Sequence, residues 1–571
     1  MNELKQITLK YTQNGSSFCL MTDGSAAQTD TVRLSAEWDG DRLSVQVAAD
    51  TEIVLEELSA EFSHTFGKKV SSIIPQLYLS EMDEQSELFP HLCEMDEHIF
   101  LNGWQSWTDS VEHGIRGKMR GLDHLPRNIL EKYALTQYGD YNFTAYPNQA
   151  GRLHGWTYGY LRRGEQFVLI GSLNEQDGFM RIETDTEAGT VSLFKDCEGL
   201  HLQGDYGMQA VILSGSEQAV FDGYFAALGL PPVKSEPIFG YTSWYRHYAN
   251  ISEQKIIDDL LGLHSLDYRA DVFQVDDGWA TAVGDWFSVD KEKFPNGMDN
   301  IADDIRKAKQ RPGLWLAPFV CEEKSEIFRE HKDWIVTDRQ GEFVRGGSNW
   351  SGFYALDIYH PEVRAYLRQV FDTVIHAWGY ALLKLDFLYA ACIEPRPDKT
   401  RGMIMADAMD FLRSVTKDAQ ILGCGVPLGS AFGKVDYCRI GCDVSLDWDD
   451  KPYMRVMHRE RISTKNSLLN SVFRRQLDGR AFGNDPDVFF LRRGIGMPAA
   501  QKQCLAEINA LTGSVLFTSD DCAEYNDNQQ IMLRQLMRLR DAEVTYAEVQ
   551  DDMLTICFRR GGKDYTKQYP L

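Results

Sequence analysis

The protein has 571 residues, a length that predicts two or three domains rather than one compact core. Its formal net charge is −25, from 59 basic and 84 acidic residues, which disfavours nucleic acid and anionic membrane as partners. With 43% hydrophobic and 25% charged residues, the composition predicts no large disordered block.

The amino-terminal residues, MNELKQITLKY, lack the basic and then apolar pattern of a signal peptide. No apolar run approaches the roughly 20 residues of a spanning helix. The 11 cysteines form no C-x-x-C pair, as is typical of reduced thiols. We therefore expect a cytoplasmic protein.

The first third of the chain is predicted to be rich in β-strands. Residues 31–48 alternate in polarity on either side of Asp39-Gly40, a hairpin signal. Residues 180–203 show the same pattern of short strands. Short strands with turn signals predict an amino-terminal β-sandwich over residues 1–230. The rigid, polar stretch PPVKSEP at 231–237 predicts the boundary of this domain.

After this boundary, predicted strands and helices alternate. A helix is expected over 360–379, because Pro361 suits its first turn, apolar residues recur at helical spacing, and Gly379 can end it. Eight apolar strands are predicted at 238–244, 271–277, 313–319, 382–388, 421–427, 437–443, 484–490 and 514–521. They predict a central (β/α)8 TIM barrel over 231–541, followed by a small β segment over 542–571. A doubly wound sheet is the alternative, although no glycine-rich phosphate motif follows the first strand.

The segment ALLKLDFLYA at 381–390 places two charges in a strand that is otherwise apolar. In a strand, Leu383, Leu385 and Phe387 should face the covering helices, so Lys384 and Asp386 should face the barrel interior. Near the carboxyl end of a barrel strand, that direction is the active site. A buried salt bridge that only fills the barrel explains this single pair equally well.

Carboxylates recur at other predicted strand ends, and so many buried acids would repel one another unless a function used them. The acids at these strand ends are Asp276, Asp277, Asp443, Asp485, Asp487, Asp520 and Asp521. A metal-dependent hydrolase would need strand-end histidines, of which only His247 is present. Glycoside hydrolysis uses paired carboxylates, and Trp244, Trp279, Trp315 and Trp350 could cover a sugar face. The pattern favours a sugar pocket, with a cation held by aspartates as an alternative.

Eight short motifs follow one another along the chain: NGWQSW (102–107), YTSWY (241–245), VFQVDDGW (272–279), LWLAPF (314–319), LLKLDFL (382–388), GCGVPLG (423–429), RIGCD (439–443) and NDPD (484–487). Taken in this order, they resemble glycoside hydrolase family 36, the α-galactosidase family of clan D. The resemblance implies a retaining, exo-acting α-galactosidase with no cofactor or metal. It implies Asp386 as the nucleophile and Asp443 as the acid/base.

The resemblance also implies the groups that bind the sugar. Its implied substrate-binding residues are Asp276, Asp277, Trp244, Trp315, Lys384, Cys424, Gly425 and Arg439. We expect Lys384 to lower the pKa of Asp386, and Arg439 to point at the sugar or at Asp386. The two catalytic carboxyl groups should lie about 5–5.5 Å apart.

Other assignments stay open at this stage. The small residues of Gly423-Cys424-Gly425 favour galactose over N-acetylgalactosamine, but an α-N-acetylgalactosaminidase, a transglycosylase and a non-catalytic sugar-binding barrel are alternatives. The NGWQSW motif could reach the pocket or pack in its own domain. The acidic stretch 447–455 is expected to be a solvated loop rather than an outer subsite. The expected partner is a small α-galactoside, and a homo-oligomer is possible.

Overall fold

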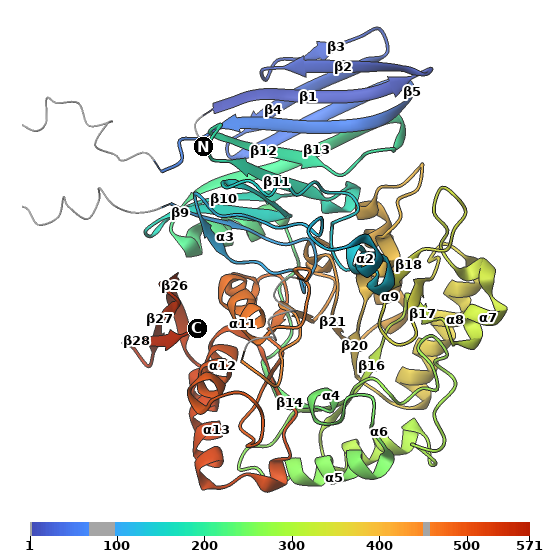
Figure 1. Ribbon diagram of the computed structural model, residues 1–571, viewed down its shortest axis with the longest axis vertical. Coiled ribbons are helices and arrows are strands. Elements are labelled where there is room, and N and C mark those ends of the chain that lie inside the picture. The colour runs from blue at the N-terminus through green and yellow to red at the C-terminus, as the bar shows by residue number, and fades with distance from the viewer. Residues whose placement is uncertain (1–2, 68–96, 449–456) are drawn as a thin grey trace, which may run out of the picture.

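The computed structural model describes residues 3–67, 97–448 and 457–571. An antiparallel sheet forms the amino-terminal region, and a larger region built on parallel strands lies beside it (Figure 1). A small three-stranded sheet ends the chain. Within the described ranges, no helix has the length and apolar character needed to cross a membrane.

Thirteen strands hydrogen-bond into the amino-terminal sheet. They are β1 (Glu3–Gln13), β2 (Ser16–Thr22), β3 (Ala27–Gln28), β4 (Val32–Asp39), β5 (Arg42–Ser63), β6 (Glu97–Leu101), β7 (Glu112–Gly114), β8 (Arg152–Trp156), β9 (Tyr158–Arg163), β10 (Gln166–Ser172), β11 (Met180–Asp185), β12 (Thr190–Lys195) and β13 (His201–Gly215). The predicted hairpin is confirmed, since Asp39 pairs with Arg42. The strands join one continuous hydrogen-bonded sheet, because the 22-residue β5 pairs with β4 along its first half and with β1 along its second. Ile7 of β1, Ile99 of β6 and Ile182 of β11 share one buried core, so this sheet folds over on itself.

Helix α3 (Glu217–Leu228) packs on β10 and β13 and leads out of this region. The Ser216 side chain caps its first turn by accepting a hydrogen bond from the Ala219 N–H. Gly229 ends the helix with φ of 63°, a conformation that glycine adopts without strain. The chain then runs without helix or strand to Ile238, through the proline-rich stretch noted in the sequence.

The second region is built on a parallel sheet. Its strands are β14 (Ile238–Thr242), β15 (Val272–Val275), β16 (Arg311–Leu316), β20 (Leu382–Leu385), β21 (Gln420–Gly423), β22 (Tyr437–Arg439), β23 (Gly483–Asp485), β24 (Val488–Phe489) and β25 (Val515–Thr518). All eight predicted strands are present, most of them ending earlier than predicted. Beginning at β14, neighbours follow chain order as far as β23, whereas a doubly wound sheet would reverse it. At the two ends of the sheet lie β23 and β24, which only Pro486 and Asp487 separate.

Helices alternate with these strands. They include α4 (Trp244–His247), α5 (Glu253–Leu263), α6 (Met298–Lys307), α7 (Glu326–Glu330), α8 (Pro361–Asp372), α9 (Arg401–Thr416), α10 (Leu428–Ala431), α11 (Thr464–Phe473), α12 (Ala499–Thr512) and α13 (Asp527–Leu539). The predicted helix at 360–379 is confirmed: α8 begins at Pro361 and continues as a π-helical turn to Ala377. Gly379 follows with φ of 83°.

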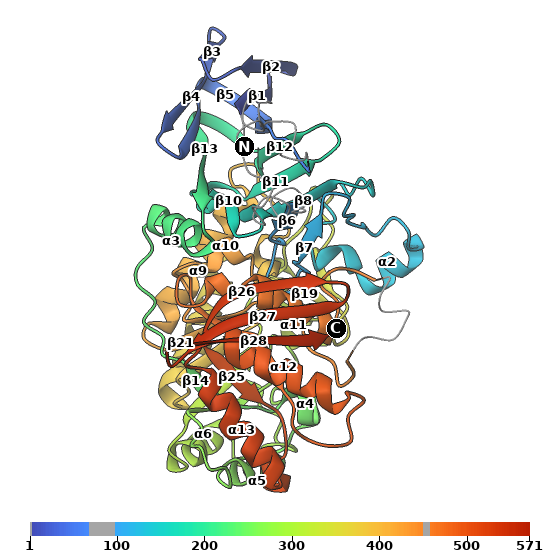
Figure 2. The same cartoon turned by 90° about the vertical axis from the view of Figure 1, so that its left-hand side faces the viewer.

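Two smaller sheets complete the fold. Strands β17 (Val320–Glu322), β18 (Arg345–Gly347) and β19 (Phe353–Ala355) form an insertion between β16 and β20 that the sequence did not predict. Strands β26 (Glu543–Gln550), β27 (Met553–Arg560) and β28 (Lys563–Pro570) form the small β element expected near the carboxyl terminus. This last sheet contacts α12 (Figure 2), where Lys567 donates to the buried Glu507 at 2.8 Å.

Candidate active site

A cavity of about 260 Å³ lies at the carboxyl ends of the parallel strands. Its inner part is lined by residues that the sequence singled out: Trp244, Asp276, Asp277, Trp315, Trp350, Lys384, Asp386 and Asp443. These residues come from at least five separate segments of the chain, which the sheet brings to one place. Strand ends are a rigid support for side chains that must keep a fixed geometry.

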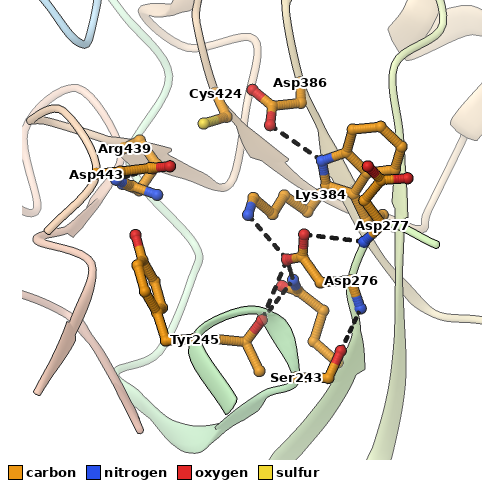
Figure 3. Close-up of polar contacts among 12 residues, drawn as sticks. Ser243, Tyr245, Asp276, Asp277, Lys384, Asp386, Cys424, Arg439 and Asp443 are labelled. Carbon is orange, nitrogen blue, oxygen red and sulfur yellow. Dashed lines mark hydrogen bonds and ion pairs between the residues drawn. The ribbon is translucent and has the colours of Figure 1, made fainter. Parts of the chain in front are cut away.

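Asp386 directly follows β20 and is buried, with 7% exposure. Its Oδ2 accepts a hydrogen bond from Trp315 Nε1 at 3.0 Å, the dashed line at Asp386 in Figure 3. Its Oδ1 accepts a second hydrogen bond from the Phe387 backbone N–H at 2.9 Å. Two donors therefore fix the plane of this carboxylate and its direction into the cavity.

Phe387 does not face the covering helices, so the sequence-based orientation of this residue was wrong. The strand ends at Leu385, and Phe387 adopts φ of 53°. This conformation turns its ring into the cavity wall, where it packs against Trp107 and Trp350 with ring centroids 5.1 Å apart in both cases. A strand-period argument fails here because the strand ends three residues before its apolar pattern does.

Lys384 forms an ion pair with Asp276 and also acts on the charge of Asp386. Its Nζ lies 2.9 Å from Asp276 Oδ2. Burial raises the pKa of Asp386 above its ordinary value and outweighs both Lys384, which lowers this pKa as expected, and the hydrogen bond from Trp315, which also lowers it. Burial lowers the pKa of Lys384, but the carboxylates of Asp276 and Asp386 outweigh it and raise this pKa well above its usual range.

Asp276 and Asp277 follow β15 and are held differently. Asp276 Oδ2 also accepts from Gln274 Nε2 at 2.7 Å, and the Asp276 backbone N–H donates to Ser243 Oγ at 2.9 Å. Asp277 Oδ2 accepts from Trp350 Nε1 at 2.8 Å. Burial raises the pKa of Asp277 to about 6, although the bond from Trp350 lowers it. Asp276 therefore forms an ion pair with a lysine, whereas the neighbouring Asp277 has a pKa raised to about 6.

Asp443 faces the cavity from the segment after β22, and Arg439 binds it. Arg439 Nη2 lies 2.9 Å from Asp443 Oδ1 and 3.1 Å from Asp487 Oδ2. The expectation that Arg439 points at Asp386 or the sugar was wrong, because these two carboxylates are nearer and Arg439 is buried with 2% exposure. The Asp443 side chain keeps 34% exposure. Burial raises the pKa of Asp487 to about 6, and the Tyr245 hydroxyl donates to its carboxylate.

Cys424, Gly425 and Arg439 lie behind the cavity wall and do not line it. Cys424 sits beside Asp386 in Figure 3 and accepts a hydrogen bond from Trp107 Nε1 at 3.2 Å. Gly425 has φ of 56°, and a Cβ there would lie 2.8 Å from an atom of the Trp107 ring. The space left by the small residues of Gly423-Cys424-Gly425 is thus occupied by an indole.

The NGWQSW motif both packs and reaches the pocket. Trp104 is buried among aromatic rings that include Phe143 and Tyr389, whereas Trp107 lines the cavity. The segment docks on the residues after β21, because Gln105 forms an isolated bridge with Pro427. An amino-terminal segment therefore builds one wall of a site that otherwise belongs to the parallel sheet.

Arg474, which sequence reasoning missed, fastens this amino-terminal segment. Its guanidinium is buried and donates to Asn102 Oδ1 at 2.9 Å, to the Ser106 carbonyl at 2.6 Å and to Ser110 Oγ at 2.8 Å. Burial lowers the pKa of Arg474 to about 10. No local signal marks this residue, since these three partners lie more than 360 positions earlier in the chain.

The strand-end tryptophans have separate roles. Trp350 reaches the cavity from the turn between β18 and β19, whereas Trp279 is fully buried and donates to the Trp315 carbonyl at 3.0 Å. The outer cavity adds residues that sequence reasoning missed, namely Tyr133, Leu135, Tyr138, Ser348, Asn349, Met457, His458, Glu460, Arg461 and Ile462. Of the acidic stretch 447–455, residues 449–455 lie outside the described residues.

Among the described residues, one group of side chains has ligand atoms close enough together to hold a metal ion. It consists of Asp333, His360 and Glu362, none of which lines the cavity. His247, which the sequence placed near a strand end, instead binds Asp259 at 2.7 Å.

The match to a known protein family covers part of the region built on parallel strands. A family profile named Melibiase matches residues 234–401, which include Asp276, Asp277, Lys384 and Asp386 but not Asp443. An α-galactosidase from Geobacillus stearothermophilus is 28% identical over 183 residues, 30% of this chain and 24% of that protein. A Flavonifractor plautii protein named A type blood α-D-galactosamine galactosaminidase is 30% identical over 151 residues, 24% of this chain and 14% of that protein.

A solved structure extends the likeness over nearly the whole chain. An α-galactosidase from Thermus thermophilus, in complex with p-nitrophenyl α-D-galactopyranoside, superposes with a TM-score of 0.69 and 25% identity, covering 95% of this chain and 98% of that one. By contrast, the sequence alignments span about a quarter or less of the curated relatives named above. Together the matches indicate a glycoside hydrolase.

Proposed function

We propose that the protein is a retaining, exo-acting α-galactosidase that removes terminal α-galactosyl residues from small glycosides. The observation that carries the proposal is that Asp386 and Asp443, from two different strand ends, line one cavity. We assign this chemistry to a (β/α)8 barrel over 231–541, flanked by β domains over 1–230 and 542–571. The ten described cysteines are free thiols, which supports a cytoplasmic location.

Asp386 acts as the nucleophile in this proposal. Its carboxylate attacks the anomeric carbon while the bond to the leaving oxygen breaks, which gives a covalent galactosyl ester. The donors Trp315 Nε1 and the Phe387 N–H fix the attacking group, so little orientation is lost on reaction. Lys384 adds positive charge nearby and favours the ionised carboxylate against burial.

Asp443 acts as the acid and then as the base. It protonates the leaving oxygen in the first step and takes a proton from the attacking water in the second. Its exposed side chain suits exchange of this proton with solvent, in contrast to the buried Asp386. Arg439 divides its hydrogen bonds between Asp443 and Asp487 and so holds the Asp443 carboxyl group in place at the cavity. Esterification of Asp386 removes one negative charge from the cavity before the second step.

The remaining inner residues hold the sugar. Asp276 and Asp277 accept hydrogen bonds from hydroxyl groups, and the rings of Trp244 and Trp315 cover apolar faces of the sugar. The cavity of about 260 Å³ falls below the roughly 300–1,000 Å³ of drug-sized sites, which disfavours a long oligosaccharide inside it. These features support exo action on a single galactosyl group.

Two variants test the assignment. Asp386→Gly should abolish hydrolysis, and added azide should restore reaction by forming β-galactosyl azide. Asp443→Ala should slow substrates with poor leaving groups far more than activated aryl galactosides, because only the former need an acid. Substantial unaided activity of the first variant, or equal losses for both substrate types in the second, would contradict the roles.

A second candidate is an α-N-acetylgalactosaminidase; the Flavonifractor relative is named for a related amino sugar, α-D-galactosamine, which favours a nitrogen substituent at the second carbon. Comparing p-nitrophenyl α-galactoside with its acetamido analogue separates the two activities. Following products in the presence of sucrose distinguishes hydrolysis from galactosyl transfer. A protein that only binds sugars would turn over none of these substrates.

A further inference from the structure

The inner part of the cavity is lined by the carboxylates of Asp276, Asp277, Asp386 and Asp443, which we call its acidic floor. The outer part differs from this floor. Four apolar side chains line it: Tyr133, at the end of helix α2 (Arg127–Tyr133), with Leu135 just after it, and Met457 and Ile462 from the segment before α11. Tyr133 keeps 40% exposure and Ile462 keeps 49%. Large apolar side chains left exposed beside a binding cavity mark a surface that a ligand covers.

Polar groups among these outer residues already have partners within the protein. The Tyr138 hydroxyl donates to Asn349 Oδ1 at 2.5 Å and accepts from the Ser348 backbone N–H at 2.9 Å. Glu460 accepts from Thr108 Oγ1 at 2.7 Å and from the Tyr141 hydroxyl at 2.9 Å. These bonds join the amino-terminal region to the walls of the cavity and leave little capacity for sugar hydroxyls.

The two remaining polar residues of the outer cavity are His458 and Arg461. The His458 ring stacks on Tyr138, with ring centroids 5.1 Å apart and planes 16° from parallel. His458 Nδ1 lies 3.5 Å from Glu460 Oε2. Arg461 donates from Nη1 to the Ile462 carbonyl at 3.5 Å. The exposed apolar side chains of the outer cavity therefore contrast with the carboxylates of its inner part, and polar side chains such as Asn349 and Arg461 lie among them.

We infer that the outer cavity binds an apolar aglycone, so that the preferred substrates are α-galactosides bearing an alkyl, aryl or lipid-like group. The inference rests on the proposed function, because it names what leaves when the galactosyl group is transferred to Asp386. A second sugar would demand hydrogen bonds that the outer residues largely make among themselves. An alkyl chain demands none, and it gains from covering Tyr133 and Ile462.

The test is kcat/KM for methyl, butyl and octyl α-galactosides, each below its micelle concentration, with raffinose for comparison. Each methylene that reaches these side chains should raise kcat/KM by about two- to fourfold. The double variant Tyr133→Ser/Ile462→Ser should lower the octyl-to-methyl ratio at least tenfold. Both side chains are exposed, so the variant should fold as the parent does.

Ile531→Ser is the matched control, because Ile531 is 44% exposed on α13 and does not line the cavity. It should leave the octyl-to-methyl ratio unchanged. An octyl-to-methyl ratio near one in the parent, or a ratio that survives the double variant, would overturn the inference. Release of galactose without chain-length preference refutes only the aglycone class, whereas no galactose release from any substrate refutes the proposed function.

Discussion

Replacing Asp277 with asparagine should stabilise the protein above pH 6. The pKa of this carboxyl is raised to about 6 by burial, from an ordinary value of 3.8. Because the folded-state pKa exceeds the unfolded one, the protonated form favours the fold. The folding free energy that protonated Asp277 contributes is fully present below about pH 4 and is lost as the pH rises through about 6.

The size of the effect follows from this difference in pKa. A shift of about two pKa units corresponds to about 3 kcal/mol of folding free energy at pH 7.5. With an unfolding entropy of about 2.1 cal/mol/K per residue, 571 residues unfolding together convert this into a rise in Tm of about 2–3 °C. An asparagine carbonyl oxygen can still accept the hydrogen bond from Trp350 Nε1.

Thermal unfolding of parent and Asp277→Asn protein at pH 7.5 and pH 4 measures this effect. The gain in Tm should be present at pH 7.5 and nearly absent at pH 4, while activity falls because the proposed sugar contact changes. A variant with lower Tm at pH 7.5, or with the same gain at both pH values, would refute the reasoning from burial.

Three further outcomes are expected. Lys384→Met should lower the free energy of unfolding by about 3–5 kcal/mol in a denaturant titration, because Asp276 is left as a buried charge without its partner. Arg474→Met should raise KM more than it changes kcat, since Trp107 loses the bonds that hold its segment, whereas Arg534→Met on the exposed face of α13 should change neither. Excess chelator should leave hydrolysis unchanged, and loss of activity that added metal restores would contradict the two-carboxylate chemistry.

The sequence predicted the positions of the parallel strands because burial on both faces produces near-continuous apolar runs such as 382–385. It predicted strand ends less well. Asp386 and Phe387 continue the alternation of β20 in sequence, but the backbone leaves the strand before them. Local pattern cannot show where a strand gives way to a loop when both are buried.

Contacts between segments far apart in the chain also could not be predicted from the sequence. Arg439 shares a motif with Asp443, yet its second partner, Asp487, depends on where the segment between β23 and β24 folds back. Trp107 and Arg474 belong to different regions of the chain and meet through Ser106. The residue types at the floor were predictable from chemistry, whereas their pairing depended on tertiary structure.

The central claim is that Asp386 becomes covalently bound to the sugar while Asp443 supplies and removes the proton. The most direct measurement is mass spectrometry of peptides after reaction with a slowly hydrolysed fluorinated α-galactosyl fluoride. The account predicts one added galactosyl group per chain, on the peptide that carries Asp386. A label on Asp443, or full turnover without any trapped ester, would contradict it.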